Sequence, residues 1–308
     1  MGLKRTASAA SAAASRVRVL TPEDYTADQV RDFLAAGPAT ASELASLVLQ
    51  SRTVPQRVVG NLERTLLEPR PDFVLGGDGR WRLATSGPAR AAAEPLESLS
   101  FVVVDVETTG MSPDRGGRIT EIAAVVVRDG RIVEEETYAT LVNPGVRIPP
   151  FIARLTGITD AMVCNEMAFA SVCEEITTRL EGHIFVAHNA SFDWGFVSAE
   201  VERASPRRLA GRPLCTVRLA RKLLPQLPRR SLDHVTRHYG IDIGDRHRAL
   251  GDAEATAKVL MRLLEAAADR GVTTWDDLDV LLSGGTGAAR RRRRSALPTP
   301  VPRAEDGR

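Results

Sequence analysis

The stretch FVVVDVETTG at residues 101–110 combines an apolar run with two acids at its end. Four apolar residues in succession predict a strand buried in a sheet, and Gly110 predicts the turn that follows it. Side chains at positions i and i+2 of a strand point to the same face, so Asp105 and Glu107 should project side by side. Carboxylates this close repel each other unless a cation lies between them, and Mg²⁺ or Mn²⁺ suits their oxygens. The alternative from this stretch alone is a strand that ends at the surface with two solvated acids.

Composition places the chain among globular proteins of more than one domain. It has 308 residues, 43% of them hydrophobic, and no run approaches the roughly 20 apolar residues of a membrane span. The N-terminus carries Lys4 and Arg5 but no apolar segment of a secretory signal. Three cysteines without a CxxC pair argue against a disulfide framework or a zinc site. We therefore expect a cytoplasmic protein with no membrane association.

Charge is distributed unevenly along the chain. Residues 1–20 hold four basic residues and no acid, and residues 287–308 hold seven arginines against two acids, so these arms sum to +4 and +5. Because the net charge is +2, the body between them carries about −7 by subtraction. Basic arms on an acidic body suit a protein that approaches a polyanion while keeping a carboxylate-rich pocket. The alternative for the five arginines at 290–294 is a solubilising tail.

The first 84 residues divide into a low-complexity arm and a small unit. Residues 1–20, rich in alanine and serine, are expected to be disordered. In residues 21–84 we predict a helix capped by Thr26 or Asp28, a second over 44–49, a third that begins near Pro55, and a hairpin over 73–83. Three helices followed by a hairpin resemble a winged helix-turn-helix module. With seven arginines and nine acids the unit is not basic, so docking to a protein and binding to DNA both stay open.

A linker and a larger domain follow. Residues 85–98 are predicted to be a linker, and residues 99–270 to form the main domain. Its apolar pattern predicts strands over 119–127, 132–141 and 184–187, and helices over 150–180, 191–203, 216–224, 232–239 and 249–268. Antiparallel strands first, and alternating strands and helices later, predict a mixed α/β sheet flanked by helices. Residues 271–286 are expected to add a short helical extension, and residues 287–308 to be a disordered arginine-rich tail.

Two further segments place acids and histidines at the ends of elements. In the first, a buried strand leads into His188 and Asn189, and a helix then carries Asp193 near its first turn. In the second, His247 is followed by Asp252 at the start of a long helix. Each residue alone has a structural explanation, because an acid stabilises a helix N-terminus and a lone histidine usually has no catalytic role.

Together the ordered motifs D-x-E, H-N-x-x-F-D and H-x-A-x-x-D resemble the DEDD exonucleases of the DnaQ-like group, in the subgroup with a histidine (DEDDh). The likeness covers about residues 99–268 and includes the flanks LTGITD at 155–160 and AHNASFD at 187–193. It extends to the epsilon proofreading subunit of bacterial DNA polymerase III and to the exonuclease domain of the Gram-positive replicative polymerase. Cys215 stands where many relatives have an aspartate outside the metal-binding set.

The resemblance implies a ribonuclease-H-like fold with a five-stranded sheet, and metal-dependent 3′→5′ hydrolysis that releases nucleoside 5′-monophosphates. Two Mg²⁺ or Mn²⁺ ions roughly 4 Å apart can activate a water and stabilise the leaving oxygen of a phosphodiester. By resemblance, Asp105, Glu107, Asp193 and Asp252 hold these ions, with Asp105 between them. His247 is the expected general base, since an imidazole titrates near neutrality.

The resemblance also suggests which residues position the substrate. Thr108, Thr109 and Gly110 form the turn after the first two acids and would approach the terminal nucleotide. His188 and Asn189 would lie near the terminal phosphates, and Leu155 and Thr156 would line the nucleotide pocket. The alternative for Gly110 is an ordinary tight turn, and the alternative for His188 and Asn189 is a structural role.

The expected substrate is DNA with single-stranded or frayed 3′ ends, degraded in proofreading or repair. RNA is the alternative substrate, because discrimination depends on contacts to the 2′-hydroxyl that the sequence does not locate. A different class of function is a winged-helix docking or regulatory protein whose exonuclease fold is an inert scaffold. Proofreading would require a DNA polymerase subunit as partner, since the chain shows no polymerase domain.

Overall fold

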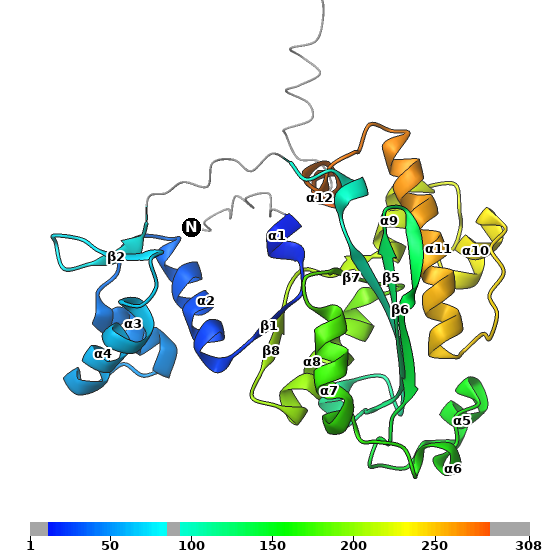
Figure 1. Cartoon of the computed structure of the whole chain (residues 1–308), viewed down its shortest axis with the longest axis horizontal. Helices are drawn as coiled ribbons and strands as arrows, with labels where there is room; N and C mark the ends of the chain where they lie inside the picture. The colour runs from blue at the N-terminus through cyan, green and yellow to red at the C-terminus, as the bar shows by residue number, and fades with distance from the viewer. Residues whose placement is uncertain (1–11, 85–92, 284–308) are drawn as a thin grey trace, which may run out of the picture.

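A five-stranded mixed sheet covered by helices on both faces forms the larger part of the molecule (Figure 1). The computed structural model describes residues 12–84 and 93–283. The sheet order is β6-β5-β4-β7-β9, with β4 (Phe101–Thr108) at its centre. β4 pairs antiparallel with β5 (Ile119–Arg128) and parallel with β7 (Ile184–Ala187). β6 (Arg131–Leu141) and β9 (Leu214–Cys215) are the edges. The predicted ribonuclease-H-like architecture is confirmed.

Alternating residues of β4 face two separate cores. Val103 packs in the core that α9 (Thr216–Leu223) and α11 (Ala249–Ala268) share with the sheet. Val102 and Val104 pack in the core on the other face, with α7 (Phe169–Leu180) and α8 (Ala190–Ala204). The period of two along a strand places Asp105 and Glu107 on the same face as Val103, toward α11.

The remaining elements of this domain lie around the sheet. α5 (Pro150–Thr156) and α6 (Asp160–Val163) follow β6, with a small core of their own. α10 (Leu232–Tyr239) packs on α11. α12 (Trp275–Leu282) is the short helix expected after residue 271. The pattern did not predict β8 (Arg208–Ala210) or β9, which have only three and two residues.

The N-terminal unit has three helices and a hairpin, in the predicted order. Its helices are α2 (Pro22–Leu34), α3 (Ala41–Leu49) and α4 (Gln56–Leu62), and α4 continues as the π-helix η1 (Glu63–Leu67). β2 (Phe73–Leu75) and β3 (Trp81–Leu83) form the hairpin. The cap predicted at Thr26 or Asp28 is wrong, because Thr21 caps α2 and accepts a hydrogen bond from the Asp24 N–H at 3.2 Å. The winged-helix resemblance of this unit stays a prediction.

Two segments that were expected to be unstructured are ordered. Residues 12–20 form α1 (Ala12–Ser15) and β1 (Arg18–Leu20), and β1 pairs antiparallel with β8. Residues 94–98 pack on the domain through a bridge from Pro95 to Thr274 and a 3-10 helix η2 (Leu96–Ser98). The predicted disorder of 1–20 and the predicted linker at 85–98 are therefore wrong for these residues. Their partners are distant in sequence, so the local pattern did not reveal them. The rest of the linker, residues 1–11, and the predicted tail at 287–308 lie outside the described residues.

Among residues 12–84 and 93–283, helices long and apolar enough to cross a membrane are absent.

Candidate active site

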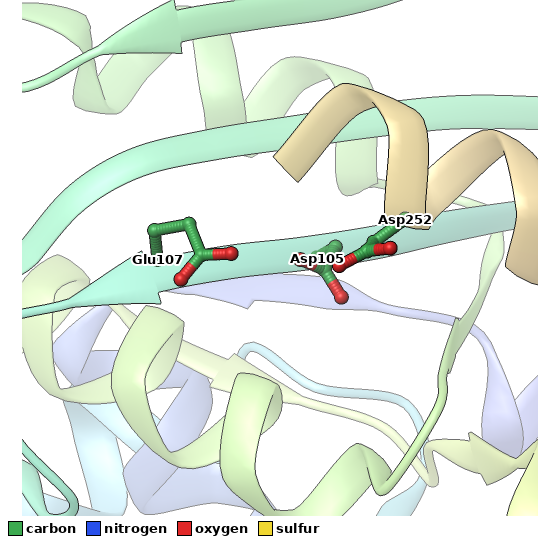
Figure 2. Close-up of side chains that lie close together, drawn as sticks. All are labelled: Asp105, Glu107 and Asp252. Carbon is green, nitrogen blue, oxygen red and sulfur yellow. The ribbon is translucent and has the colours of Figure 1, made fainter. Parts of the chain in front are cut away.

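Three predicted acids meet at the end of the central strand. Asp105 and Glu107 project from β4, and Asp252 faces them from the first turn of α11 (Figure 2). One carboxylate oxygen from each lies within 4.8 Å of the others, which is close enough for a shared metal ion. The opening alternative of two solvated acids does not hold, because both side chains are partly buried and the third acid is buried beside them.

An ion pair with a buried glutamate fixes the helix that carries Asp252. Glu121 on β5 pairs with Glu107 in register, and it is only 4% exposed. Its carboxylate accepts hydrogen bonds from the Arg248 guanidinium at 2.6 Å and from the Ala249 N–H at 2.9 Å. The second bond satisfies a free N–H at the start of α11. Glu121 therefore attaches the helix N-terminus to the sheet, one turn before Asp252.

A glycine allows the preceding loop to pack against α11. A Cβ atom at Gly251 would overlap the backbone carbonyl oxygen of Asp245. Only glycine permits this approach without moving the loop. The loop carries Arg246 and His247, so the close contact at Gly251 sets their position relative to Asp252.

Burial raises the pKa of all three acids, and neighbouring carboxylates add to the shifts of Asp105 and Glu107. Burial is the main cause of the high pKa of Asp105, and the charges of Asp193, Asp252 and Glu107 add to it. Burial, followed by the charge of Asp252, raises the pKa of Glu107 to about 8. The pKa of Asp252 is also raised by burial, against the opposing effect of the Arg246 charge. A site that disfavours its own negative charge in this way is well suited to bind cations.

The fourth predicted acid lies beside these three. Asp193, in the first turn of α8, is 4% exposed, and its Oδ1 accepts a hydrogen bond from the Val106 N–H at 3.3 Å. This bond holds the carboxylate against the strand between Asp105 and Glu107. Burial raises the pKa of Asp193 to about 7, and the backbone hydrogen bonds oppose the shift. Asp193 is not one of the three acids whose oxygens lie within 4.8 Å of one another, and its role at a second ion stays a prediction.

The donor set fits a divalent metal centre. Within the described residues, the carboxylates of Asp105 and Glu107 accept no hydrogen bond, and the buried Oδ1 of Asp252 has no partner. Buried acceptors without donors are costly, and hard cations satisfy such oxygens. Arg246 brings a positive charge to the cluster: its guanidinium contacts Asp252 Oδ2 and donates to Asp233 at 2.8 Å. Arg246 thus neutralises part of the charge of the cluster.

His247 stands at the edge of this cluster. It is half-buried, with a left-handed backbone (φ 64°), and its N–H donates to Asp252 Oδ2 at 3.3 Å. Its Nδ1 lies 3.5 Å from Arg246 Nη1. A non-glycine residue at positive φ is uncommon and is often held in place at a functional site. The structure brings the histidine next to the acids, as the motif predicts.

Four of the seven predicted substrate-binding side chains are turned into the protein. The Thr108 hydroxyl donates to the Gly110 carbonyl at 2.7 Å, and the Thr109 hydroxyl accepts from the Arg118 N–H at 3.0 Å. The Thr156 hydroxyl is buried and bonds within the end of α5. These three threonine hydroxyls have partners within the protein and shape the turns, which leaves the neighbouring backbone groups of these turns to approach a nucleotide.

His188 also has structural partners. Its Nδ1 bonds to the Thr216 hydroxyl and its Nε2 to the Arg230 carbonyl, both at 2.8 Å. Burial lowers its pKa to about 4, against the raising effect of the Arg230 hydrogen bond. Both ring nitrogens are used and the ring is held neutral, so His188 is not available here for the predicted phosphate contact.

The other three candidates remain accessible. Leu155 on α5 is 54% exposed. Asn189 is exposed, with a left-handed backbone (φ 85°), and its side chain forms no capping bond at the start of α8. A Cβ at Gly110 would meet no atom within 4 Å. Their predicted contacts with substrate stay predictions.

Sequence reasoning missed the charged residues that support the site. Glu121, Asp233, Arg246 and Arg248 were not singled out. The RHR triplet at 246–248 was a usable signal, because two arginines flank a candidate base next to an acid. Asp233 and Glu121 gave none, since their partners are 13 and 127 residues away.

Comparison with known proteins agrees with this geometry. The exonuclease family (RNase_T) matches residues 102–260. A DNA polymerase III subunit epsilon-like protein of Rhodobacter capsulatus is 42% identical over 206 residues, which are 66% of this chain and 28% of that protein. The 3′-5′ exonuclease DinG of Bacillus subtilis is 42% identical over 165 residues, 54% of this chain and 18% of that protein.

One solved structure, exonuclease X in complex with 5′ overhanging duplex DNA, is 30% identical with a TM-score of 0.46. It covers 59% of this chain and 99% of its own. The chain spans 28% and 18% of the lengths of the two curated relatives above. The matched region holds both strand acids, Asp193, His247 and Asp252. With its acids gathered at the end of β4, this chain belongs to the exonuclease family.

Proposed function

We propose that the chain is a metal-dependent 3′→5′ exonuclease that removes nucleoside 5′-monophosphates from the 3′ ends of DNA. The observation that carries the proposal is the group of three carboxylates within 4.8 Å, with a buried Asp252 oxygen that has no partner. DNA is favoured over RNA because relatives are named as a DNA polymerase III subunit epsilon-like protein and as PolC-type DNA polymerase III. Proofreading or repair is the role expected from the resemblance, and it stays a prediction.

The carboxylates of Asp105, Glu107 and Asp252 would hold one divalent ion, and those of Asp105 and Asp193 a second. Bound Mg²⁺ or Mn²⁺ would supply the positive charge that a pentacovalent phosphoryl centre needs and would make a bound water more acidic. The raised pKa values of Asp105, Glu107 and Asp193 mean that proton release from these groups accompanies loading of the site.

His247 would act as general base in this proposal. Its backbone N–H is bonded to Asp252, and the close contact at Gly251 fixes the loop that carries it beside the cluster. A base positioned in this way accepts the proton of the attacking water and typically contributes ~10²–10⁴-fold to the rate. Arg246, which contacts Asp252, would bring a positive charge to the side of a substrate phosphate bound at the cluster.

The accessible residues complete the assignment. Leu155 would contact the terminal nucleotide, and the backbone at Gly110 would approach it. Asn189 would lie near the terminal phosphates. The choice between Mg²⁺ and Mn²⁺, a polymerase subunit as partner and the cytoplasm as compartment stay predictions.

The test is digestion of 5′-labelled single-stranded DNA, primed DNA with a 3′ mismatch, and RNA, each with Mg²⁺, Mn²⁺ or EDTA. Asp105→Asn removes one charge from the cluster, and Glu166→Gln on the exposed surface is the matched control. We expect metal-dependent shortening of DNA from its 3′ end by the wild type and the control, and none by the Asp105 variant. If RNA is digested in preference to DNA, RNA is the substrate and the DNA assignment is rejected. Absence of cleavage with metal bound would favour the inert scaffold and reject the proposal.

A further inference from the structure

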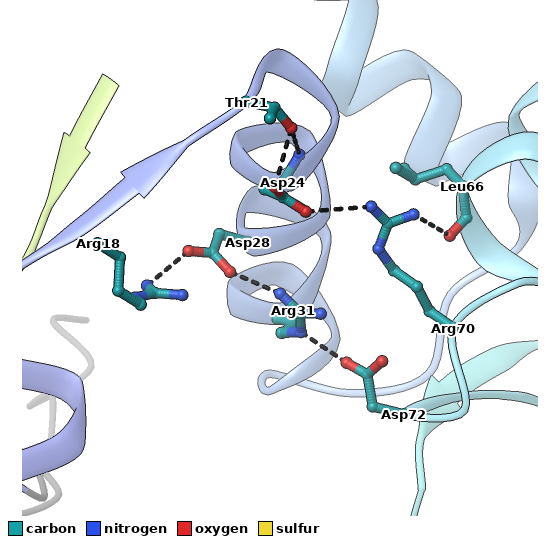
Figure 3. A network of polar contacts seen from close by, with 8 residues as sticks. All are labelled: Arg18, Thr21, Asp24, Asp28, Arg31, Leu66, Arg70 and Asp72. Carbon is teal, nitrogen blue, oxygen red and sulfur yellow. Dashed lines mark hydrogen bonds and ion pairs between the residues drawn. The ribbon is translucent and has the colours of Figure 1, made fainter. Parts of the chain in front are cut away.

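The N-terminal unit carries arginines of two kinds. Four of the seven arginines in residues 21–84 are in ion pairs within the unit: Arg31, Arg70, Arg80 and Arg82. Figure 3 shows part of this network, in which Arg31 bridges Asp28 and Asp72 and Arg70 reaches Asp24 at 3.4 Å. Five of the nine acids are thereby neutralised by neighbouring cations, on α2, the start of α3 and the hairpin.

The other three arginines are unpaired and lie together in the chain. Arg52, Arg57 and Arg64 are exposed and form no ion pair or hydrogen bond within the described residues. Arg57 and Arg64 lie on the continuous helix of α4 and η1, and Arg52 lies just before it. The whole unit has a small negative charge, which argued against a basic face. Its unpaired arginines are nevertheless gathered in one part of the unit, so a basic face is present there.

The helix presents these arginines on its outer face. Arg57, Asn61 and Arg64 follow one another at i, i+4 and i+7, which is one side of a helix. The opposite side buries Val59, Leu66 and Leu67 in the core of the unit. α2 lies toward β1 and the exonuclease domain, whereas α3 and α4 lie on the far side of the unit (Figure 1).

The acids of this helix do not neutralise the face. Glu63 is half-buried and accepts a hydrogen bond from the Trp81 ring N–H at 3.1 Å. Glu68 follows η1 and forms no ion pair with Arg64. Unpaired arginines are available for bidentate bonds to phosphate.

We propose that the outer face of α4 and η1, together with Arg52, binds duplex DNA. An α-helix is ~10–12 Å wide and fits the ~12 Å major groove of B-DNA, whereas the major groove of an RNA helix is too narrow. Arginine serves phosphates and guanine edges, and Asn61 offers an amide that suits adenine. A protein partner is disfavoured, because none of the exposed large apolar residues of the described chain lies in residues 50–68, and the nearest in sequence is the single Leu49 at the end of α3.

This site is separate from the exonuclease centre, and its test does not need that centre. The ligand is a covalently closed DNA dumbbell, which has no 3′ end, labelled with a fluorophore and titrated with the full chain in EDTA. Arg57→Gln with Arg64→Gln removes two unpaired charges. Arg80→Gln with Arg82→Gln removes two charges that are paired with Glu43 and Asp78 in the same unit. The arginines at 290–294 are unchanged in all three proteins.

The readout is the slope of log K against log salt concentration. Each lost phosphate contact reduces this slope by ~0.9 for B-DNA, so the unpaired double variant should lose ~1.8. The paired double variant should keep the wild-type slope, and each single variant, Arg57→Gln or Arg64→Gln, should lose ~0.9. Equal slopes for the two double variants would overturn the proposal. So would failure of the full chain to bind the dumbbell, which would leave this face to a protein partner.

Discussion

The metal-free protein should lose stability as pH rises, and Glu107→Gln should remove a defined part of that loss. Burial and the charge of Asp252 raise the pKa of Glu107 from 4.5 to about 8. The folded state therefore binds more protons than the unfolded state between these values. Stability is complete below pH 4.5 and falls as pH rises toward 8. A glutamine keeps the shape of the side chain but has no proton to lose.

The size of the effect follows from the shift. One pKa unit corresponds to ~1.4 kcal/mol, and integration of the linkage relation from pH 5 to pH 7 gives roughly 2.5 kcal/mol for Glu107 alone. For a domain of this size that corresponds to roughly 5–10 °C in the unfolding midpoint. A divalent ion that binds the folded wild type should restore the lost stability. At a hundred times its Kd it raises the free energy of unfolding by roughly 2.7 kcal/mol.

Differential scanning calorimetry in EDTA at pH 5 and pH 7 measures this difference. The midpoint of Glu107→Gln should exceed that of the wild type by several degrees more at pH 7 than at pH 5. Glu166→Gln, at an exposed position, should follow the wild type at both values. An offset between Glu107→Gln and wild type that does not change with pH would refute the electrostatic reasoning.

Three further predictions concern the histidines and the loop. His247→Gln should lower kcat by ~10²–10⁴-fold while calorimetry still detects metal binding; unchanged kcat across neutral pH would remove it as the base. Burial lowers the pKa of His188 from 6.5 to about 4, so the unfolded state takes up a proton that the folded state does not. The free energy of unfolding should therefore fall by roughly 3 kcal/mol as pH falls from 6.5 to 4. His188→Gln should flatten this part of the pH dependence of the unfolding midpoint, and an unaltered profile would contradict the assignment. Gly251→Ala should displace the loop of His247 and cost ~10²-fold in kcat, whereas Gly244→Ala, with no atom within 4 Å of its new Cβ, should be near wild type.

The strands and helices of the larger domain could be predicted because their signals are local. The apolar run of β4 and the stripe along α11 lead directly to a buried centre and a covering helix. The same reasoning failed for residues 12–20 and 94–98, which are held by β8 and by Thr274. When a short segment pairs with a strand far away in the sequence, its own residues carry almost no local pattern that predicts the pairing.

The site shows the same division. The positions of Asp105, Glu107 and Asp252 follow from strand periodicity and from a motif at a helix start, and the structure brings them together. The orientation of a threonine hydroxyl or a histidine ring depends on partners elsewhere in the chain. His188 is an example, because its bonds to Thr216 and Arg230 could not be inferred from the motif.

The most direct test of the metal centre is a count of bound Mn²⁺. Electron paramagnetic resonance measures free Mn²⁺ in the presence of the full chain and a nucleoside 5′-monophosphate. We predict two ions bound to each wild-type chain, and a loss of bound Mn²⁺ in Asp105→Asn, whose side chain would contact both ions. The assignment of these carboxylates as the metal centre would be contradicted by either of two results. One is the same number of bound Mn²⁺ ions per chain in the Asp105 variant and the wild type, and the other is no bound Mn²⁺ in either protein.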